Sequence, residues 1–445
     1  MAVLAAGRGT RMKSALPKVL HPVCGTPMAG HVIEAARCLR PASIAVVVGH
    51  EGQRVRDALA AADLTFVDQP DLLGTADAVA RCRESLGGCE TVLVVNGDQP
   101  LTTTELLQAV LDGRGAAPMA FATCTLDDAG RLGRVARDSH GAVSAIVEAA
   151  DLPAVSGPAE VNAGVYAFDA AWLWDALARI ARSPSGEYYL THLAALAHED
   201  GTPAVAVACE PGAFLGVDDR RALARAEAAM RTRILERHME RGVTIIDPAT
   251  TYIDAAVHIA EDVTILPNCY LYGSTEAASG ATIGPGTILR NARIGRDSRV
   301  ESSVIEDSRI GERVRVGPFA HVRGGADIGD DCELGNYAEV KNSRIGRRVK
   351  MHHFSYIGDA DVGEDTNIAA GIITCNFDGK EKHRTTIGRN VFIGSDTMLI
   401  APVTLGDHSA TGAGSVVTRD VPPGTLVVGM PARRVRRRDP EAAEE

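Results

Sequence analysis

The sequence is poor in aromatic residues, in long apolar runs and in paired cysteines. Only 4% of its 445 residues are aromatic, whereas 45% are hydrophobic and 45 residues are glycine. This aliphatic, glycine-rich composition suits an α/β domain combined with a β-helix. There is no apolar run long enough for a transmembrane helix and no signal peptide, so we expect no membrane insertion.

The nine cysteines are scattered along the chain and form no C-x-x-C pair. Several of them, such as Cys332, fall at small core positions. We therefore expect buried thiols in a reducing cytoplasm instead of disulfides or metal ligands.

The formal net charge of −11 argues against general nucleic-acid binding. One basic run, Arg433–Arg438, precedes the acidic end Asp439–Glu445, and we expect a solvated tail there. The chain is longer than one hydrophobic core usually serves, so at least two domains are expected.

In the second half of the chain, aliphatic residues recur at every sixth position. The longest run is Val304, Ile310, Val316, Val322, Ile328, Leu334 and Val340, and the spacing recurs at Ile288, Ile294 and Val300 and again from Ile387 to Leu405. A step of six spreads side chains over three faces of an α-helix, and one long strand would bury Pro318 and Asp330. The spacing therefore predicts a triangular coil of hexapeptides instead of chance alternation in another β domain. The register breaks once, at Ile373–Thr386, where we expect a loop on the binding face.

Strand and helix patterns alternate over residues 1–217, which predicts a mainly parallel sheet. The expected strands are Ala2–Ala5, Ile44–Val48, Leu64–Val67, Val92–Val95 and Met119–Thr123, and the expected helices are Met28–Leu39, Thr75–Ser85 and Glu105–Leu111. Thr102 and Glu105 form a candidate capping box. The first strand is short, and we expect part of the edge of the sheet to be missing there.

Residues Asp219–Arg241 contain no Gly or Pro and are rich in Ala. They predict one rigid connecting helix of about 34 Å, ended by Gly242. Its expected apolar stripe is Leu223, Ala226, Met230 and Ile234.

The segment Leu4-Ala5-Ala6-Gly7-Arg8-Gly9-Thr10-Arg11-Met12 follows the first strand, and Pro17-Lys18 comes shortly after it. Two glycines allow backbone N–H groups to approach an anion closely. A G-x-G alone usually marks a structural tight turn, but here Pro17 and the cations Arg11 and Lys18 accompany it. The combination favours phosphate binding, with a spacing that differs from a Walker A motif.

Two further groups stand at strand ends, where ligands of such sheets bind. Asn96-Gly97-Asp98 ends one strand, and Asp98 suits Mg²⁺, which prefers one or two carboxylates plus phosphate oxygens. The alternative for Asp98 is a helix or turn cap. Gln69 and Gly74-Thr75 end another strand, where they suit the edge of a base or form a plain turn and cap.

His352 and His353 lie inside the repeat. Adjacent side chains of an extended chain point to opposite sides, so we do not expect the pair to chelate one metal. One of them can act as a general base, because imidazole titrates near neutral pH. Composition alone favours a structural histidine on a coil face.

Taken in order, these stretches resemble the bacterial family of bifunctional N-acetylglucosamine-1-phosphate uridyltransferases/glucosamine-1-phosphate N-acetyltransferases. The likeness covers nearly the whole chain and rests on the six-residue ladder and on Leu4–Lys18, Gln69–Thr75, Asn96–Asp98, Gly133-Arg134, Glu148, Glu160–Gly164 and Gly186–Thr191. It implies a Rossmann-like nucleotidyltransferase domain at 1–217, a linker helix at 218–241, and a left-handed parallel β-helix acetyltransferase domain with a C-terminal tail at 242–445.

The resemblance also implies a cytoplasmic enzyme that makes UDP-N-acetylglucosamine in two steps. The first step transfers the acetyl group of acetyl-CoA to glucosamine 1-phosphate. The second is a Mg²⁺-dependent attack of N-acetylglucosamine 1-phosphate on the α-phosphorus of UTP, which releases pyrophosphate.

For the first domain, the resemblance assigns three groups of residues. Lys18 and Arg11 neutralise the phosphates as catalytic cations, and Asp98 and Asp218 bind Mg²⁺. Asp218 stands where the family usually has Asn, which adds negative charge beside the phosphates. The substrate-binding residues are Leu4, Ala5, Ala6, Gly7, Gln69, Gly74 and Thr75 for uridine, Asn96 and Gly97 beside them, and Gly133, Glu148 and Asn162 for N-acetylglucosamine.

For the β-helix, the resemblance makes His353 the general base, with Glu339 to orient it. Glucosamine 1-phosphate is assigned to Arg323, Lys341, Tyr356 and Asn367, and acetyl-CoA to Ala370, Asn376, Phe377, Ser395 and Ala413. Phe377 replaces a usual Tyr and removes one hydroxyl. A family Arg has no equivalent at Gly429–Met430, so Arg433 or a neighbour is the candidate for the CoA phosphates.

In the resembled family, three chains pack in parallel with the acetyl sites between them, so a homotrimer is expected. One rival is a single-activity sugar-nucleotide pyrophosphorylase whose β-helix only assembles or regulates it, against which His353, Lys341 and Arg323 together argue. The other rival is a non-catalytic binding scaffold, which predicts no pyrophosphate release from UTP.

Overall fold

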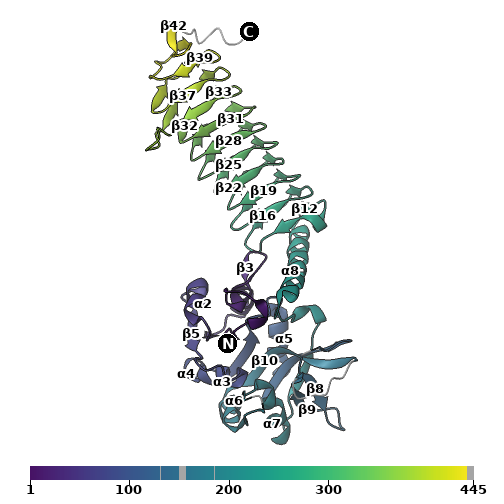
Figure 1. Cartoon of the computed structure of the whole chain (residues 1–445). Helices are drawn as coiled ribbons and strands as arrows, with labels where there is room; N and C mark the ends of the chain where they lie inside the picture. The colour runs from purple at the N-terminus through teal and green to yellow at the C-terminus, as the bar shows by residue number, and fades with distance from the viewer. Residues whose placement is uncertain (131, 150–156, 185, 438–445) are drawn as a thin grey trace. The chain divides into compact units, whose positions relative to one another are not determined.

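The computed structural model describes residues 1–130, 132–149, 157–184 and 186–437 (Figure 1). Contacts divide the chain into two compact units, Met1–Met230 and Arg231–Glu445. Within the described residues, no helix combines the length and the apolar character needed to cross a membrane. The acidic end of the expected tail lies outside the described residues.

The first unit is built on a nine-stranded sheet with the order β11-β7-β10-β6-β1-β4-β5, in which β8 pairs with β10 and β9 with β8. Its strands are β1 (Ala2–Leu4), β4 (Ile44–Val48), β5 (Leu64–Asp68), β6 (Thr91–Asn96), β7 (Met119–Leu126), β8 (Arg134–Arg137), β9 (Val143–Val147), β10 (Ala159–Asp169) and β11 (Val205–Ala208); β2 (Pro22–Val23) and β3 (Thr26–Pro27) form a separate hairpin.

The predicted parallel strands are confirmed, because β5, β4, β1 and β6 run parallel, as do β7 and β11. The strand β10 is antiparallel to both β6 and β7. The first strand is not an edge strand. Short as it is, β1 lies between β4 and β6 in the middle of the sheet and pairs with both.

Helices of the first unit are α1 (Met28–Cys38), α2 (Gly52–Leu59), α3 (Thr75–Arg81), α4 (Arg83–Leu86), α5 (Thr104–Arg114), α6 (Ala170–Ala176) and α7 (Leu193–Glu199). The single helix expected at Thr75–Ser85 is divided at Cys82. The capping box is also wrong, because Thr103 is the N-cap of α5 and its hydroxyl accepts from the Leu106 N–H at 3.2 Å. Thr102 is instead buried in the preceding turn, where its N–H donates to the Gln99 carbonyl.

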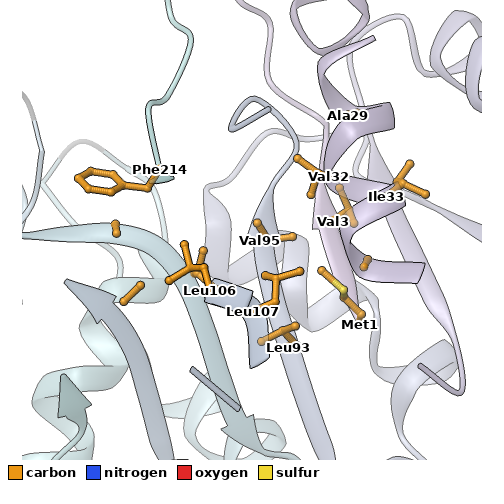
Figure 2. Close-up of a cluster of buried hydrophobic side chains, with 14 of the residues drawn as sticks. Met1, Val3, Ala29, Val32, Ile33, Leu93, Val95, Leu106, Leu107 and Phe214 are labelled. Atoms are coloured by element: carbon orange, nitrogen blue, oxygen red, sulfur yellow. The ribbon is translucent and has the colours of Figure 1, made fainter. Parts of the chain in front are cut away.

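The apolar sides of two helices, α1 and α5, cover one face of this sheet (Figure 2). Alternate residues of the strands, such as Val3, Leu93 and Val95, point to the same face because side chains of a strand have a period of two. Residues at helical spacing pack on them: Ala29, Val32 and Ile33 from α1, with Leu106 and Leu107 from α5. This packing fixes the carboxyl ends of β1 and β6, where the candidate nucleotide site lies.

The long helix predicted after residue 218 is α8 (Arg220–Glu240). Asp219 caps it, because its carboxylate accepts from the N–H groups of Arg221 and Ala222 at 2.9 and 2.8 Å. Gly242 follows with φ of 89°, as expected for a C-terminal stop. The buried stripe begins at Ala222, whereas Leu223 is only half-buried.

The second unit is a left-handed β-helix with three sheets, whose strands are parallel except for the last strand of the first sheet. The first sheet contains β12 (Thr244–Ile245), β15 (Thr264–Ile265), β18 (Thr282–Ile283), β21 (Arg299–Val300), β24 (Arg315–Val316), β27 (Glu333–Leu334), β30 (Lys350–Met351), β33 (Asn367–Ile368), β36 (Phe392–Ile393), β39 (Ala410–Thr411), β41 (Thr425–Val428) and β42 (Arg433–Arg437).

The second sheet contains β13 (Tyr252–Ile253), β16 (Tyr270–Tyr272), β19 (Ile288–Arg290), β22 (Val304–Glu306), β25 (His321–Arg323), β28 (Ala338–Lys341), β31 (Ser355–Gly358), β34 (Ile373–Cys375), β37 (Met398–Ile400) and β40 (Val416–Val417). The third contains β14 (His258–Ile259), β17 (Glu276–Ala277), β20 (Arg293–Ile294), β23 (Arg309–Ile310), β26 (Asp327–Ile328), β29 (Arg344–Ile345), β32 (Ala360–Val362), β35 (Thr385–Ile387) and β38 (Val403–Leu405).

The predicted ladder is confirmed from Ile310 to Val340, but two of its positions are off by one. Ile305 and Leu289 are fully buried, whereas Val304 and Ile288 are only half-buried. The step from Ile305 to Ile310 is five residues, because Asp307 turns the corner with φ of 48°. Asp and Asn adopt this left-handed conformation more readily than other non-glycine residues, so they allow a shorter corner.

This register makes a direct prediction for stability. We expect Ile305→Ala to lower the free energy of unfolding by about 2–5 kcal/mol, because it leaves a cavity in the coil. Val304→Ala, at the neighbouring half-buried position, is expected to cost about 1 kcal/mol or less. Urea unfolding of the two variants compares them directly, and a larger loss for Val304→Ala would contradict the assigned register.

The break in the repeat is narrower than predicted, because β34 and β35 both belong to their sheets and only the loop between them departs from the coil. The basic segment expected to be a solvated tail is a strand over Arg433–Arg437. It forms β42, which pairs antiparallel with β41 and covers the edge of that strand. The side chains of Arg433 and Arg434 are exposed, as a solvated segment predicts.

All nine cysteines are free thiols. Cys332 is buried in the coil interior, where its Sγ donates to the Gly346 carbonyl at 2.9 Å. Burial raises the pKa of the Cys332 thiol to about 11, so this cysteine is a neutral core residue, as its position in the repeat predicts.

Candidate functional site

In the first unit, a cavity of about 680 Å³ opens at the carboxyl ends of the parallel strands. The predicted residues that line it are Leu4, Ala6, Gly7, Gln69, Gly74, Thr75, Asn96 and Asp98. Ala5 is buried behind the wall, and the Gly97 N–H donates to the Leu4 carbonyl at 2.8 Å. These two residues therefore shape the backbone of the cavity.

The glycine-rich loop after β1 lies over the side chain of Lys18. A Cβ at Gly9 would stand 2.5 Å from the Lys18 Cβ, and Gly9 has φ of 61°. Arg8, Gly9 and Thr10 join Gly7 in the cavity wall. The loop thus brings several backbone groups and Lys18 to one place, as the phosphate-binding interpretation requires.

Lys18 joins two carboxylates that are far apart in the sequence. Its Nζ lies 2.5 Å from an oxygen of Asp98 and 2.5 Å from Oδ1 of Asp218. Arg11 contacts the same Asp218 oxygen at 2.9 Å. Burial disfavours the ammonium of Lys18, but the two carboxylates outweigh it and raise the pKa of Lys18, so the ammonium stays charged.

The geometry fits one divalent cation held by Asp98 and Asp218 together with substrate phosphates. Both carboxylates converge on a single point, which Lys18 contacts, and neither is fully buried. Among the described residues there is no cluster of three or more His, Cys, Asp and Glu that could hold a metal without substrate. Two carboxylates plus phosphate oxygens is the ligand set that suits Mg²⁺.

Gln69 is buried at the cavity wall with a fixed amide orientation. Its Nε2 donates to the Gly74 carbonyl at 2.9 Å and to the Asp77 carboxylate at 2.8 Å. Both amide protons are thereby used. The remaining group, Oε1, can only accept, which matches the N–H at position 3 of uracil and mismatches the acceptor at that position of cytosine.

Gly74 stands at the start of α3 with φ of 106°, and a Cβ there would lie 2.5 Å from the Tyr188 carbonyl oxygen. That carbonyl accepts from the Ala76 N–H at 2.9 Å, and the Thr75 hydroxyl accepts from the Leu190 N–H at 2.9 Å. The close approach of these segments therefore requires glycine.

We expect Gly74→Ala to destabilise the first unit by about 1–3 kcal/mol, since the new Cβ meets backbone in a strained conformation. It should also weaken binding of the nucleotide, because Gln69 bonds to the Gly74 carbonyl. Thermal unfolding and the KM for the nucleotide measure the two effects. Gly88→Ala is the matched control, because no atom lies within 4 Å of its added Cβ; equal behaviour of both variants would contradict the prediction.

The three residues predicted for the sugar lie together. The Asn162 N–H donates to the Gly133 carbonyl at 2.9 Å, and a Cβ at Gly133 would lie 3.7 Å from the Glu148 carboxylate. The Thr191 hydroxyl donates to Glu148 at 2.7 Å, and the Asn162 amide donates to the hydroxyl of Tyr166 at 2.6 Å. Carboxylate, amide and small residue thus form a polar wall suited to sugar hydroxyls and an acetamido group.

In the β-helix, four predicted residues stand at the same corner of successive coils: His353, Ala370, Ser395 and Ala413. Backbone hydrogen bonds join these corners, with the N–H of Gly371 on the Phe354 carbonyl, that of Asp396 on the Ala370 carbonyl and that of Gly414 on the Ser395 carbonyl, each at 2.8 Å. The small residues leave room for an extended chain along this ridge. His353 is exposed at its end.

Only one of the two adjacent histidines has a carboxylate partner. His352 Nε2 lies 2.7 Å from a Glu333 oxygen, whereas no described carboxylate forms an ion pair with His353. The ring planes stand at 88° to each other. His353 is therefore the one whose imidazole is free of a charged neighbour.

A second group of predicted residues lies at or near the carboxyl ends of strands in the second sheet, whereas His353 precedes the start of β31. Arg323 and Lys341 are paired neighbours at the ends of β25 and β28. The amide of Asn376 donates to the hydroxyl of Tyr356 at 3.4 Å and to the carboxylate of Asp359. Burial of Asp359 works against its ionised form, but hydrogen bonds from Asn342 and Asn376 outweigh it and lower its pKa. Asp359 is thus a fixed anion that anchors the loop at Asn376.

One expectation differs from what the structure shows. Glu339 accepts from Arg323 at 2.6 and 3.1 Å, and among the described residues no hydrogen bond joins it to His353. Asn367 lies in another sheet than Arg323 and Lys341, where it pairs with Lys350 and Phe392, so its assignment to the same ligand stays a prediction. Phe377 lies in the loop after β34, bridged to Lys382, and is 58% exposed.

Two residues at these sites were not predicted from the sequence. Glu187 lines the nucleotide cavity. It belongs to the stretch Gly186–Thr191 that carries the resemblance, but no role was assigned to it. Lys382 stands beside Lys341, whose ammonium lowers the pKa of Lys382. The signal that could have identified Lys382 was its position in the loop that interrupts the repeat. The ammonium groups of Lys341 and Lys382 together suit a phosphate group.

Known protein families match both units. The family described as "MobA-like NTP transferase domain" matches residues 1–242, and "Bacterial transferase hexapeptide (six repeats)" matches residues 307–342 and 384–419. The first match stops where the β-helix begins, and the gap in the second contains the loop that interrupts the repeat.

Curated relatives match nearly the full length. The "Bifunctional protein GlmU" of Streptomyces avermitilis is 42% identical over 442 residues, which cover 97% of this chain and 92% of the relative. The protein of the same name from Paenarthrobacter aurescens is 43% identical, covering 97% and 89%. That from Stutzerimonas stutzeri is 44% identical over 439 residues, covering 97% and 96%.

Proposed function

Because this chain belongs to the family of bifunctional GlmU proteins, we propose that its first unit transfers a uridylyl group and its second an acetyl group. The product of the two steps is UDP-N-acetylglucosamine. The observation that carries this function is a match along both halves of one chain, which speaks against the single-activity rival. We assign residues 1–217 to uridylyl transfer, 218–241 to the linker helix and 242–445 to acetyl transfer.

In the first unit, the residues would act by positioning and by neutralising charge. Gln69 accepts from uracil, the loop at Gly7 and Gly9 lies against the phosphates, and Lys18 and Arg11 offset their charge. Gly133, Glu148 and Asn162 hold N-acetylglucosamine 1-phosphate, so that its phosphate attacks the α-phosphorus in line with the departing pyrophosphate. No covalent protein intermediate is needed.

Asp98 and Asp218 would hold Mg²⁺, which supplies further neutralisation of the phosphates. Asp218 already holds Lys18 and Arg11 at 2.5 and 2.9 Å. The extra carboxylate at this position therefore fixes both cations before substrate binds. Pyrophosphate release from UTP and N-acetylglucosamine 1-phosphate tests the assignment, with full activity expected in Mg²⁺ and none in excess EDTA; activity unchanged by EDTA would contradict it.

In the second unit, His353 would take the proton from the amine of glucosamine 1-phosphate as the amine attacks the thioester of acetyl-CoA. The facing ammoniums of Lys341 and Lys382, with Arg323, suit the phosphate group, while Tyr356 and Asn367 complete the sugar site. Ala370, Ser395 and Ala413 offer a smooth ridge to the pantetheine arm, together with Asn376 and Phe377. The exposed Arg433 remains the candidate for the CoA phosphates.

We propose a homotrimer with the acetyl sites between copies. In one chain His353 and Lys341 stand at opposite ends of neighbouring strands, so a groove between two chains can bring both kinds of residue to one ligand. Phe319, Tyr337 and Phe354 stand at the same corner as His353 and are 55%, 60% and 60% exposed, and such exposed aromatics are typical of interfaces. Light scattering should give three times the chain mass of 46.8 kDa; a monomer active in acetyl transfer would contradict this. The free thiols support a cytoplasmic location.

A further inference from the structure

A second large cavity, of about 810 Å³, lies within the second unit. It is lined by the last turns of α8 and by coils that carry β14, β17, β20 and β23. It shares no residue with the two candidate sites described above. A volume of this size suits a small organic ligand.

Five arginines line this cavity, and part of their positive charge is uncompensated. Arg293 lies 3.6 Å from Glu276, and Arg309 lies 2.7 Å from Asp327. The other lining carboxylate, Glu312, is paired with Arg313 outside the cavity. In contrast, no carboxylate of the described residues lies within ion-pairing distance of the three remaining arginines, Arg237, Arg241 and Arg296.

His238 is aimed into the same cavity from α8. It is 3% exposed, and neither Nδ1 nor Nε2 has a hydrogen-bond partner among the described residues. Burial, together with Arg237, Arg241 and His258, lowers the pKa of His238 to about 4. At neutral pH the ring is therefore uncharged, with one N–H that has no acceptor. Leaving such a donor buried without an acceptor is unfavourable, and it calls for a partner.

We propose that this cavity is a binding site for a small organic polyphosphate, with Arg237, Arg241 and Arg296 on its phosphates and the His238 N–H as a further donor. Guanidinium groups match phosphate oxygens in charge and in bidentate geometry. The chain's net charge of −11 disfavours a nucleic acid as the occupant. The site is independent of the two transfer reactions, since none of their residues takes part.

Site-resolved protection of arginines tests this on the full-length protein. The probe is inorganic tripolyphosphate, which has no base or sugar for the nucleotide cavity to recognise. Phenylglyoxal modifies accessible arginines, and mass spectrometry of peptides reads each one separately. At ten times its Kd, tripolyphosphate should slow the modification of Arg237, Arg241 and Arg296 by roughly tenfold, because about a tenth of the sites stay free. Arg225, exposed on the same helix and outside the cavity, should be unaffected.

A variant separates binding at this cavity from general screening by salt. In Arg237→Gln/Arg241→Gln, checked for an unchanged melting temperature, tripolyphosphate should no longer protect Arg296; Arg225→Gln is the matched control and should keep that protection. The proposal is overturned if none of the three arginines is protected, if Arg225 is protected equally, or if Arg296 stays protected in the double variant. It is also overturned if Arg237 and Arg241 fail to react without anion, since another copy of the chain would then cover them.

Discussion

Replacing His353 with Ala should lower the rate of acetyl transfer by roughly 10²–10⁴-fold, the usual contribution of a general base. Uridylyl transfer should be unchanged, because His353 belongs to the second unit and the nucleotide cavity to the first. His353 is exposed at the end of the ridge of small residues, so removing its ring leaves no cavity in the coil interior. Release of free CoA and release of pyrophosphate measure the two activities on the same preparation.

The chain provides a matched control for this variant in the adjacent residue. His352 bonds to Glu333 at 2.7 Å on the neighbouring sheet, so His352→Ala removes an imidazole without removing the proposed base. We expect it to retain most of its acetyl transfer. Equal loss of both activities in His353→Ala, or a larger loss in His352→Ala, would contradict the assignment of the base.

Replacing Lys18 with Gln should lower the rate of uridylyl transfer by roughly 10²–10³-fold, as removal of one group that stabilises transition-state charge commonly does. Lys18 is the cation that both Asp98 and Asp218 contact. Without it Asp98 loses this ion pair and Asp218 keeps only Arg11, so more negative charge faces the incoming phosphates. Acetyl transfer should be unaffected. Initial rates of pyrophosphate release at saturating substrate measure the effect.

Lys13→Gln is the control for this second variant. Lys13 lies in the same loop, is exposed and makes no ion pair among the described residues. We expect its activity to stay near that of the unchanged protein. If Lys13→Gln lost as much activity as Lys18→Gln, the effect would come from the overall charge of the loop and not from the contacts of Lys18.

The six-residue spacing was enough to predict the coil, because only a bent chain can bury an aliphatic residue at each sixth place. It did not decide between neighbours such as Val304 and Ile305, which are equally aliphatic. That choice depends on a corner shortened at Asp307, and the corner depends on hydrogen bonds to the coils before and after it. The same limit explains β42, whose pairing with β41 is a contact that its basic sequence does not signal.

In the candidate sites, too, the sequence could place some residues but not all of their contacts. Residues next to a strand end, such as Gln69 and Asn96, could be placed from the sequence, because parallel strands bring their carboxyl ends to one edge. The contact of Asp218 with Lys18 joins residues 200 positions apart, and only the resemblance pointed to Asp218. Glu339 shows the converse, since the resemblance suggested a contact with His353 and the side chain instead bonds to Arg323.

One coupled assay on the full-length protein tests most directly whether a single chain carries two separate transfers. It contains glucosamine 1-phosphate, acetyl-CoA, UTP and Mg²⁺, and each is omitted in turn while free CoA and pyrophosphate are recorded. Without UTP, CoA release should continue and pyrophosphate should be absent; without acetyl-CoA, pyrophosphate should return only when N-acetylglucosamine 1-phosphate is added. Pyrophosphate release with no CoA release in the complete mixture would contradict the account.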